Sequence, residues 1–171
     1  MLTAEQRTPR KPARATSRRK TGQAKALRPS HFAQVYQADL MERIAFIRKG
    51  ISPTELVRTS KAMRLPQEHI YKMLRLPAST TKRKLALNAL FSPEQSERIL
   101  GLQRLIGQVE VMVAESGADA KSFDAAAWVA RWLDEASPAL SNKRPGEFMD
   151  TVAGQEIVSN LLAKMQSGAY A

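Results

Sequence analysis

Apolar side chains recur along most of the chain at intervals of three and four residues, which is the spacing that places them on one face of an α-helix. The first such stripe consists of Tyr36, Leu40, Ile44 and Ile47, and it predicts a single helix that ends near Gly50. No segment alternates convincingly between apolar and polar positions, as a half-exposed β-strand would. The pattern therefore predicts an all-α protein.

Two helix starts are marked by the same short motif. Residues 52–55 read Ser-Pro-Thr-Glu and residues 92–95 read Ser-Pro-Glu-Gln. In each motif the serine can cap the helix, the proline suits the first helical position, and the last residue can complete a capping box. Pro66 and Pro77 predict further boundaries between these starts, because the residue before a proline is pushed out of the helical region.

A long amphipathic helix is predicted from Pro93 to near Gly117. Its apolar face consists of Ile99, Leu102, Ile106, Val109 and Val113. Gly101 and Gly107 fall inside this helical pattern, where close approach of a neighbouring helix is the better explanation for a glycine.

Three more helices are predicted towards the C-terminus. One spans residues 123–135 and contains Trp128 and Trp132, which we expect to anchor the core or a dimer interface. A short one spans residues 146–149. The last runs from an N-cap at Thr151 to about Gln166, with an apolar face formed by Ile157, Leu161 and Met165.

Charge divides the chain into three parts. Residues 1–31 carry nine basic residues against one acidic residue, a net charge of +8. Residues 32–92 carry eleven against four, a net charge of +7, and residues 93–171 carry seven against eleven, a net charge of −4. A basic first half and an acidic second half predict two partners of different kinds, of which the first is a polyanion. A tail that is basic only for solubility is the alternative.

The first 31 residues contain almost no large apolar side chains and are rich in Pro, Thr, Ser, Gln, Lys and Arg. Such a segment cannot bury enough surface to offset the entropy of ordering its backbone, so we expect a disordered basic arm. The chain is thus predicted to consist of an arm over residues 1–31, a helical domain over residues 32–91 and a second helical domain over residues 92–171.

The composition excludes several classes of protein. The chain has no cysteine, which removes disulfide scaffolds, thiolate metal sites and cysteine nucleophiles, and favours a reducing interior such as the cytoplasm. No apolar stretch approaches the roughly 18 residues of a membrane span, and no apolar core of a secretory signal follows the basic start. Prolines at positions 9, 12 and 29 argue against the amphipathic helix of a transit peptide. We expect a cytoplasmic protein without a membrane partner.

Catalysis by this chain is not expected. Its two histidines, His31 and His69, have no nucleophile or metal-ligand partner at a recognisable spacing. The sequence also contains no Gly-rich phosphate loop. We therefore predict no enzyme activity, no cofactor and no metal site.

Residues 67–87 have the organisation of a helix-turn-helix. The first helix would bury Ile70, Met73 and Leu74, and the second would be anchored by Leu85. The second helix would present hydroxyl groups and cations on Ser79, Thr80, Lys82, Arg83 and Lys84. Such a surface suits the major groove of DNA, because Ser and Thr can bond phosphates or base edges, Arg can bind guanine bidentately, and Lys adds positive charge.

A second interpretation of the same residues stays open. Arg75 stands where a turn glycine is common, and Pro77 stands where a capping Ser or Thr would be expected. Helix-turn-helix spacing also arises by chance in all-α chains. The pattern is therefore compatible with a basic helix face that is only solvated.

Four segments of the C-terminal part follow one another in a characteristic order. They are Ser-Pro-Glu-Gln-Ser-Glu-Arg at residues 92–98; Trp132-Leu133 with Ser-Pro-Ala-Leu at residues 137–140; Arg-Pro-Gly-Glu-Phe-Met-Asp-Thr at residues 144–151; and a closing set of Gly154, Val158, Leu161, Leu162, Met165, Gly168, Tyr170 and Ala171. Together, behind a helix-turn-helix of the Xre kind in residues 51–87, they resemble the toxin-binding domain of the Xre/MbcA/ParS antitoxins, bacterial proteins that are paired with RES-domain toxins.

This resemblance implies an antitoxin of a bacterial type II toxin–antitoxin system. It implies an Xre-like helix-turn-helix domain that represses the protein's own operon, a homodimer or a larger hetero-oligomer with the toxin, and a block on the active site of a RES-domain toxin that degrades NAD. Members of the family place their C-terminal end over the toxin's cleft, where cations of a dinucleotide site could hold the terminal carboxylate. The residues expected to contact the toxin are Arg144, Met165, Gly168, Ala169, Tyr170 and Ala171.

The residues alone leave other functions open. The main alternative is a stand-alone helix-turn-helix transcription regulator whose C-terminal domain only dimerises. Another is an RNA-binding protein in which the basic arm makes the contacts. The last residues are also compatible with an ordinary frayed C-terminus.

Overall fold

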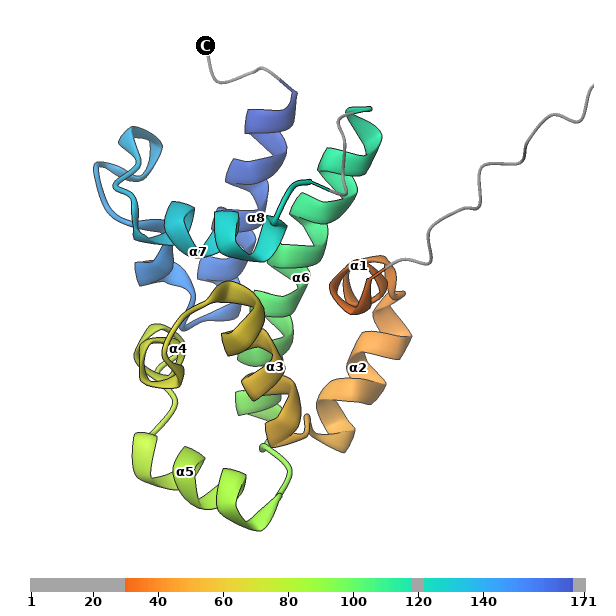
Figure 1. The fold of residues 1–171 in the computed structure, drawn as a ribbon, viewed down its shortest axis with the longest axis vertical. Helices are drawn as coiled ribbons and strands as arrows, with labels where there is room; N and C mark the ends of the chain where they lie inside the picture. The colour runs from red at the N-terminus through yellow and green to blue at the C-terminus, as the bar shows by residue number, and fades with distance from the viewer. Residues whose placement is uncertain (1–29, 118–121, 168–171) are drawn as a thin grey trace, which may run out of the picture.

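The computed structural model describes residues 30–117 and 122–167, and within them the regular elements are all helical (Figure 1). In chain order these are α1 (His31–Gln37), α2 (Leu40–Lys49), α3 (Pro53–Met63), α4 (Gln67–Met73), α5 (Ala78–Leu87), α6 (Pro93–Glu115), α7 (Ala125–Asp134), the short 3-10 helices η1 (Pro138–Leu140) and η2 (Pro145–Phe148), and α8 (Val152–Gln166). The all-α prediction is confirmed. The expected disordered arm lies almost wholly outside the described residues.

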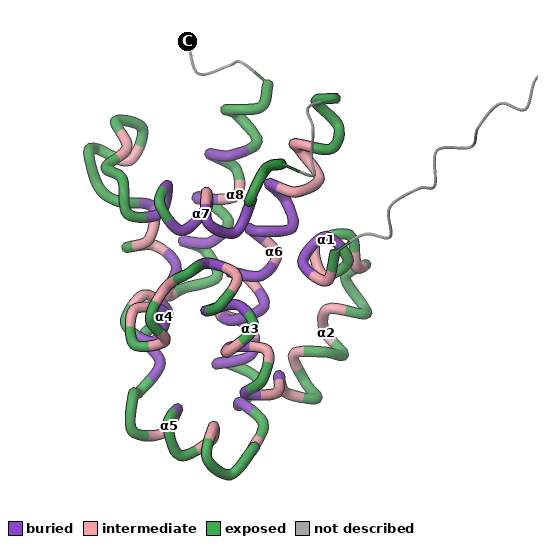
Figure 2. Tube along the Cα trace, viewed as in Figure 1, coloured by how far each residue is buried: buried purple, intermediate pink, exposed green. Residues whose placement is uncertain are grey.

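The long helix α6 is the element around which the others are arranged (Figure 1). It packs against α1, α2, α7 and α8, and its own Ile99, Leu102 and Ile106 are fully buried. One cluster of buried apolar side chains extends from Phe32 in α1 to Leu162 in α8. Figure 2 shows the buried stretches concentrated along α6 and α7, whereas α2 and α5 are mostly exposed or half-buried. The division into domains at residue 92 stays a prediction.

Both predicted helix starts occur where the sequence motif places them. At the start of α6 the Ser92 hydroxyl accepts a bond of 3.3 Å from the Gln95 backbone N–H, and the Ser92 backbone N–H donates to Gln95 Oε1 at 3.2 Å. This is a complete capping box. At the start of α3 the Ser52 hydroxyl accepts from the Thr54 backbone N–H at 3.3 Å. The Glu55 carboxylate does not complete the expected capping box and contacts Arg58.

The single helix predicted from the first apolar stripe is wrong. The chain leaves the helical conformation at Ala38 and Asp39, so that Tyr36 lies in α1 whereas Leu40 lies in α2. Asp39 Oδ1 accepts from the Glu42 backbone N–H at 2.9 Å, and the Glu42 carboxylate accepts from the Asp39 backbone N–H at 3.2 Å. The sequence signal was the Asp39–Glu42 spacing, which is that of a capping box.

The glycines of α6 permit close helix packing, as expected. An added Cβ at Gly107 would overlap the backbone carbonyl of Phe32 in α1, and one at Gly101 would overlap the side chain of Gln155 in α8. These two positions set how closely α1 and α8 approach α6.

The last helix begins at the predicted cap but buries a different face. The Thr151 hydroxyl accepts from the Gly154 backbone N–H at 3.1 Å. Of the predicted apolar face, Leu161 is buried, but Ile157 and Met165 are 48% and 39% exposed. The buried face of α8 consists of Gly154, Gln155, Val158, Leu161 and Leu162. Gly154 and Gln155 belong to it because they lie where α8 approaches η2 and α6 most closely.

In α7 the rings of Trp128 and Trp132 stack with their centroids 5.8 Å apart and their planes 10° from parallel. Trp132 is buried, which fits the expectation of a core anchor. Across the two described ranges, no helix combines the length and the apolar character needed to cross a membrane.

Candidate DNA- and toxin-binding surfaces

The predicted helix-turn-helix forms as two helices, α4 and α5, joined by residues 74–77. Ile70 and Leu74 are fully buried, while Met73 and Leu85 are partly buried against the same core. Arg75 adopts φ 47°, the left-handed conformation that glycine favours, and Pro77 caps α5 without a side-chain hydrogen bond. Arg75 therefore takes the conformation that a turn glycine would take, and α5 begins without the side-chain cap that a Ser or Thr would supply.

The turn is held by contacts from outside the motif. Arg98 of α6 donates through Nη1 to the backbone oxygens of Leu74 at 2.9 Å and Arg75 at 3.1 Å, while its Nη2 lies 2.6 Å from a Glu94 carboxylate oxygen. Arg75 Nε lies 2.9 Å from Asp150 Oδ2. A cation at the end of α4 satisfies its terminal carbonyl groups and interacts favourably with the helix dipole. These contacts compensate for the absence of a glycine.

The helix α5 protrudes from the molecule and packs on α3 and α4 (Figure 1). Ser79, Lys82 and Arg83 are exposed, and their spacing places them on one face of the helix. Thr80 is half-buried beside them. No hydrogen bond or ion pair within the described part of the chain engages Arg83, so its guanidinium is available to a ligand.

Two of the predicted DNA-contacting cations have partners within the protein. Lys84 is half-buried, and its Nζ donates to the backbone oxygen of Leu90 at 2.6 Å, which directs it towards the segment after α5. Lys82 Nζ lies 3.3 Å from Glu68 Oε1. A backbone hydrogen bond, and secondly Lys82, lower the pKa of the Glu68 carboxyl. Phosphate oxygens would have to compete with Glu68 for Lys82.

Two ion pairs link α4 and the turn after it to the second half of the chain. His69 Nε2 lies 3.5 Å from Asp134 Oδ1 of α7, and the turn residue Arg75 pairs with Asp150. Between α4, α7 and η2 lies an open cavity of about 510 Å³ that is also lined by Arg144 and Glu147. Of the two helices, α5 is the more exposed, since Thr81 is its single buried residue.

The residues predicted to contact the toxin are described only in part. Arg144 is exposed at the start of η2, where its backbone N–H donates to Glu147 Oε1 at 3.1 Å. Met165 is exposed in the last turn of α8. The predicted plug of Gly168, Ala169, Tyr170 and Ala171 lies outside the described residues.

Sequence reasoning missed a third surface beside α2. Leu40, Met41 and Phe46 are exposed there, and Arg43 and Arg104 enter a cavity next to this helix. The apolar stripe suggested core positions for this region, and no sequence signal pairs an arginine of α2 with one of α6. Within the described residues, no group of three or more His, Asp or Glu side chains is placed to hold a metal ion.

Two protein-family models and a known protein match this chain. The model of the antitoxin Xre-like helix-turn-helix domain matches residues 42–104, and that of the antitoxin Xre/MbcA/ParS C-terminal toxin-binding domain matches residues 121–168. The Prs ADP-ribosylating antitoxin of Sphingobium sp. (strain YBL2) is 40% identical over 149 residues, which cover 87% of this chain and 93% of that relative.

A helix-turn-helix domain followed by a toxin-binding domain defines a toxin–antitoxin regulator. The chain belongs to the Xre/MbcA/ParS family of antitoxins. Membership points to a regulatory role rather than a catalytic one, with DNA and a toxin as the partners that the two matched domains suggest. The resemblance drawn from the sequence motifs is confirmed.

Proposed function

We propose that this antitoxin binds and blocks the active site of a RES-domain toxin that degrades NAD, and that it represses its own operon in the bacterial cytoplasm. The observation that carries the proposal is the match to a helix-turn-helix domain and to a toxin-binding domain within one chain. The name of the Sphingobium relative joins an antitoxin to ADP-ribosylation, a reaction that takes its ADP-ribose from NAD. That relationship supports a toxin that consumes NAD.

Operator DNA is bound through the exposed face of α5. Arg83 is the candidate for reading a base, because its guanidinium is exposed and unengaged within the described residues. Ser79, Thr80 and Lys82 add bonds to phosphates or base edges. Lys84 contributes charge next to this face while it holds the segment after α5. In a homodimer, two α5 helices would read two half-sites.

The toxin is bound through the acidic second half of the chain. A net charge of −4 over residues 93–171 steers this half towards a basic cleft. Met165 offers an exposed apolar contact in the last turn of α8, and Arg144 offers a cation at the start of η2. Residues 168–171, which lie outside the described residues, would then enter the cleft.

Replacing Lys82 and Arg83 tests the DNA-binding face. We expect Arg83→Ala to weaken operator binding by about 1 to 3 kcal/mol and Lys82→Ala to reduce the salt dependence of binding by roughly one counterion. Fluorescence anisotropy at several salt concentrations measures both quantities. Arg131→Ala, at an exposed position of α7, is the control. Unchanged affinity and salt dependence in a Lys82→Ala, Arg83→Ala double variant would show that α5 is not the reading helix.

Deletion of residues 168–171 tests the toxin block. In cells that also produce the toxin, the truncated antitoxin is expected to lose protection while it still co-purifies with the toxin through the rest of the C-terminal half. The full chain is the control. Equal protection by both forms would contradict the plug. If no toxin encoded beside this gene co-purifies with the full chain, the stand-alone transcription regulator becomes the better interpretation.

A further inference from the structure

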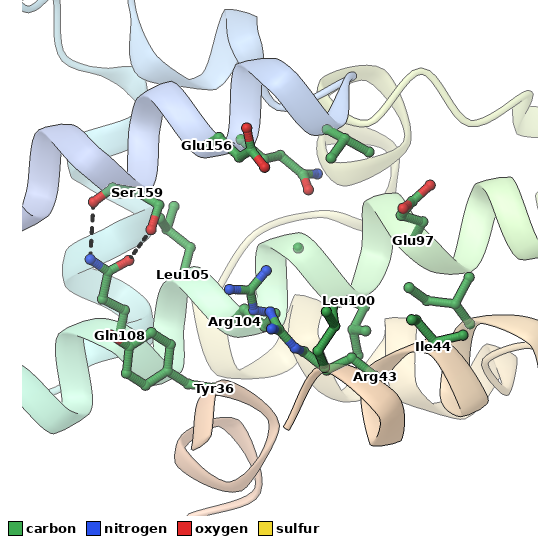
Figure 3. Close-up of a pocket in the computed structure, with 15 residues that line it drawn as sticks. Tyr36, Arg43, Ile44, Glu97, Leu100, Arg104, Leu105, Gln108, Glu156 and Ser159 are labelled. Carbon is green, nitrogen blue, oxygen red and sulfur yellow. Dashed lines mark hydrogen bonds between the residues drawn. The ribbon is translucent and has the colours of Figure 1, made fainter. Parts of the chain in front are cut away.

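A cavity of about 410 Å³ opens between α2, α6 and α8 (Figure 3). The helix α2 lines it with Leu40, Arg43, Ile44 and Ile47, whose spacing places them on one face of that helix. Residues of α6 that include Leu100 form the floor, and residues of α8 form the opposite wall. Small-molecule sites in proteins have volumes of about 300 to 1,000 Å³. The cavity is therefore large enough for a small organic ligand.

The amide side chains of the cavity are already bonded to the protein. The Ser159 hydroxyl donates to Gln108 Oε1 at 2.7 Å, and Gln108 Nε2 donates to the Ser159 backbone oxygen at 3.0 Å. Gln155 Nε2 donates to the backbone oxygens of Arg98 at 3.0 Å and Met149 at 2.9 Å. These bonds hold α8 against α6, and they leave the charged side chains as the strongest groups available to a ligand.

Two arginines enter the cavity without a carboxylate partner among the described residues. Arg43 of α2 and Arg104 of α6 lie close together in Figure 3. The Nε of Arg104 is inaccessible to solvent and has no hydrogen-bond partner, and the Nε of Arg43 reaches the Asp39 backbone oxygen only at 3.4 Å. Burial, and secondly the charge of Arg43, lower the pKa of the Arg104 guanidinium. Both side chains thus have N–H groups that an anion could use.

An anion between the two guanidinium groups would relieve two unfavourable features of the empty cavity. Like charges disfavour each other's charged form, and a buried donor is left unsatisfied. A carboxylate matches the planar donor geometry of a guanidinium. Glu97 and Glu156 also line the cavity, so the formal charges of its lining balance. A doubly charged phosphate would be repelled by these two residues more strongly than a singly charged carboxylate.

Much of the remaining lining is apolar. It comprises Leu40, Ile44 and Ile47 from α2 and Leu100 and Leu105 from α6. An apolar group that packs against these side chains leaves water, which favours binding. A ligand that fits the whole cavity therefore combines one carboxylate with an apolar body.

We propose that this cavity is a binding site for a small organic monocarboxylate. Arg43 and Arg104 hold its carboxylate, and the apolar side chains of α2 and α6 pack against its body. The site goes beyond the proposed function and does not depend on it. Its walls come from both matched domains, since most of α2 lies in residues 42–104 and α8 lies in residues 121–168. A bound carboxylate would therefore contact both parts of the antitoxin.

Isothermal titration calorimetry of the full chain with phenylbutyrate tests the site. We expect saturable binding of the carboxylate. Phenylbutyramide has the same apolar body without the charge, and we expect it to bind roughly tenfold more weakly or less, because it cannot form charge-assisted hydrogen bonds with the arginines. Inorganic phosphate at the same concentration is expected not to displace phenylbutyrate.

Arg43→Met and Arg104→Met remove the donors and keep a long side chain at each position. Each substitution is expected to raise the dissociation constant of phenylbutyrate roughly tenfold or more. Arg48→Met is the matched control, because Arg48 is an exposed residue of α2 that does not line the cavity. Phenylbutyrate should raise the Tm of the unaltered chain and of this control but not that of Arg104→Met, since a ligand stabilises only the folded state that binds it. The same melting curves show whether each variant is folded.

Three results would overturn the proposal: no saturable binding of phenylbutyrate to the unaltered chain, equal affinity for the amide, or unchanged affinity in the folded Arg43→Met and Arg104→Met variants. Displacement by inorganic phosphate would overturn it by assigning the arginines to a phosphate ligand. Absence of phenylbutyrate binding together with weaker toxin binding by Arg104→Met would assign the cavity to a carboxylate of the toxin. Operator and toxin binding are measured separately, so failure of this site is distinct from failure of the antitoxin function.

Discussion

At the scale of single residues, Arg98 shows how a side chain far along the chain supports a turn. Its guanidinium bonds the carbonyl groups of Leu74 and Arg75, where the backbone takes a left-handed conformation. The sequence did show that Arg75 occupies a glycine-like position. It did not show what stabilises that position, because Arg98 and Asp150 approach the turn only after α6 and η2 have packed.

Replacing Arg98 by Met should destabilise the protein. Its side chain is only 14% exposed, and the change would leave the partly buried carbonyl group of Leu74 and the exposed one of Arg75 without their charged donor. We expect a loss of about 1.5 to 3 kcal/mol in the free energy of unfolding, measured by urea denaturation. Arg58→Met is the matched control, because Arg58 forms an exposed ion pair with Glu55 and should cost less than about 1 kcal/mol. Equal effects of the two substitutions would contradict the support given to the turn.

The predicted DNA-contacting residues illustrate a second limit of prediction from the sequence. Their types and spacing could be read from the sequence, and the exposure of Ser79, Lys82 and Arg83 agrees with that pattern. The hydrogen bond from Lys84 to the backbone oxygen of Leu90 could not be read from the sequence, since it depends on how the segment after α5 turns back. A cationic residue type therefore indicates a binding face but does not say which cations are free.

At the scale of helices, capping motifs predicted boundaries better than apolar stripes did. The Ser92 motif gave the start of α6. The Asp39–Glu42 capping box, which starts α2 and interrupts the helix that the stripe had joined, was not among the predicted motifs. The stripe is continuous in the sequence although the chain changes direction between α1 and α2 (Figure 1). The faces of α8 could not be assigned from Ile157 and Met165, because burial there depends on which neighbours reach the helix.

Replacing Gly107 by Ala tests the contact between α1 and α6, because helix propensity and packing predict changes of opposite sign in the free energy of unfolding. If helix propensity alone mattered, Gly107→Ala would stabilise α6 by about 0.5 to 1 kcal/mol. An added Cβ would, however, overlap the backbone of Phe32, which cannot move without displacing α1. We therefore expect net destabilisation by about 1 to 3 kcal/mol in urea denaturation.

The control for this substitution is Ala114→Gly, at an exposed position of the same helix. It reports propensity alone and should cost about 0.5 to 1 kcal/mol. A stabilising Gly107→Ala would mean that α1 does not pack on α6 as closely as described.

At the scale of the whole molecule, the halves that differ in charge share one core. The cluster of buried side chains extends from α1 to α8, and ion pairs such as Arg64–Asp124, with 2.6 Å between Nη2 and Oδ2, join the two sides. Charge and motifs indicated two functional parts. The extent of their shared core could not be read from them, because it arises from contacts between distant segments.

Shared packing predicts that the described helices unfold together. Both tryptophans lie in α7, so their fluorescence reports on the second half, whereas far-ultraviolet circular dichroism reports on all helices. The two signals should give the same urea midpoint, as in a two-state transition. Separate midpoints would show that the halves fold independently, as the predicted division at residue 92 implies.

Because α6 packs against helices of both halves, their relative orientation depends on the rotational phase of α6. Each residue advances an α-helix by about 100° and 1.5 Å. Adding or removing one residue between Gly101 and Gly107 would therefore rotate everything built on the later part of α6 by more than a quarter turn. Insertions or deletions in this helix are in consequence far more disruptive than most substitutions, and its length must be retained for α5 and the end of α8 to keep their mutual direction.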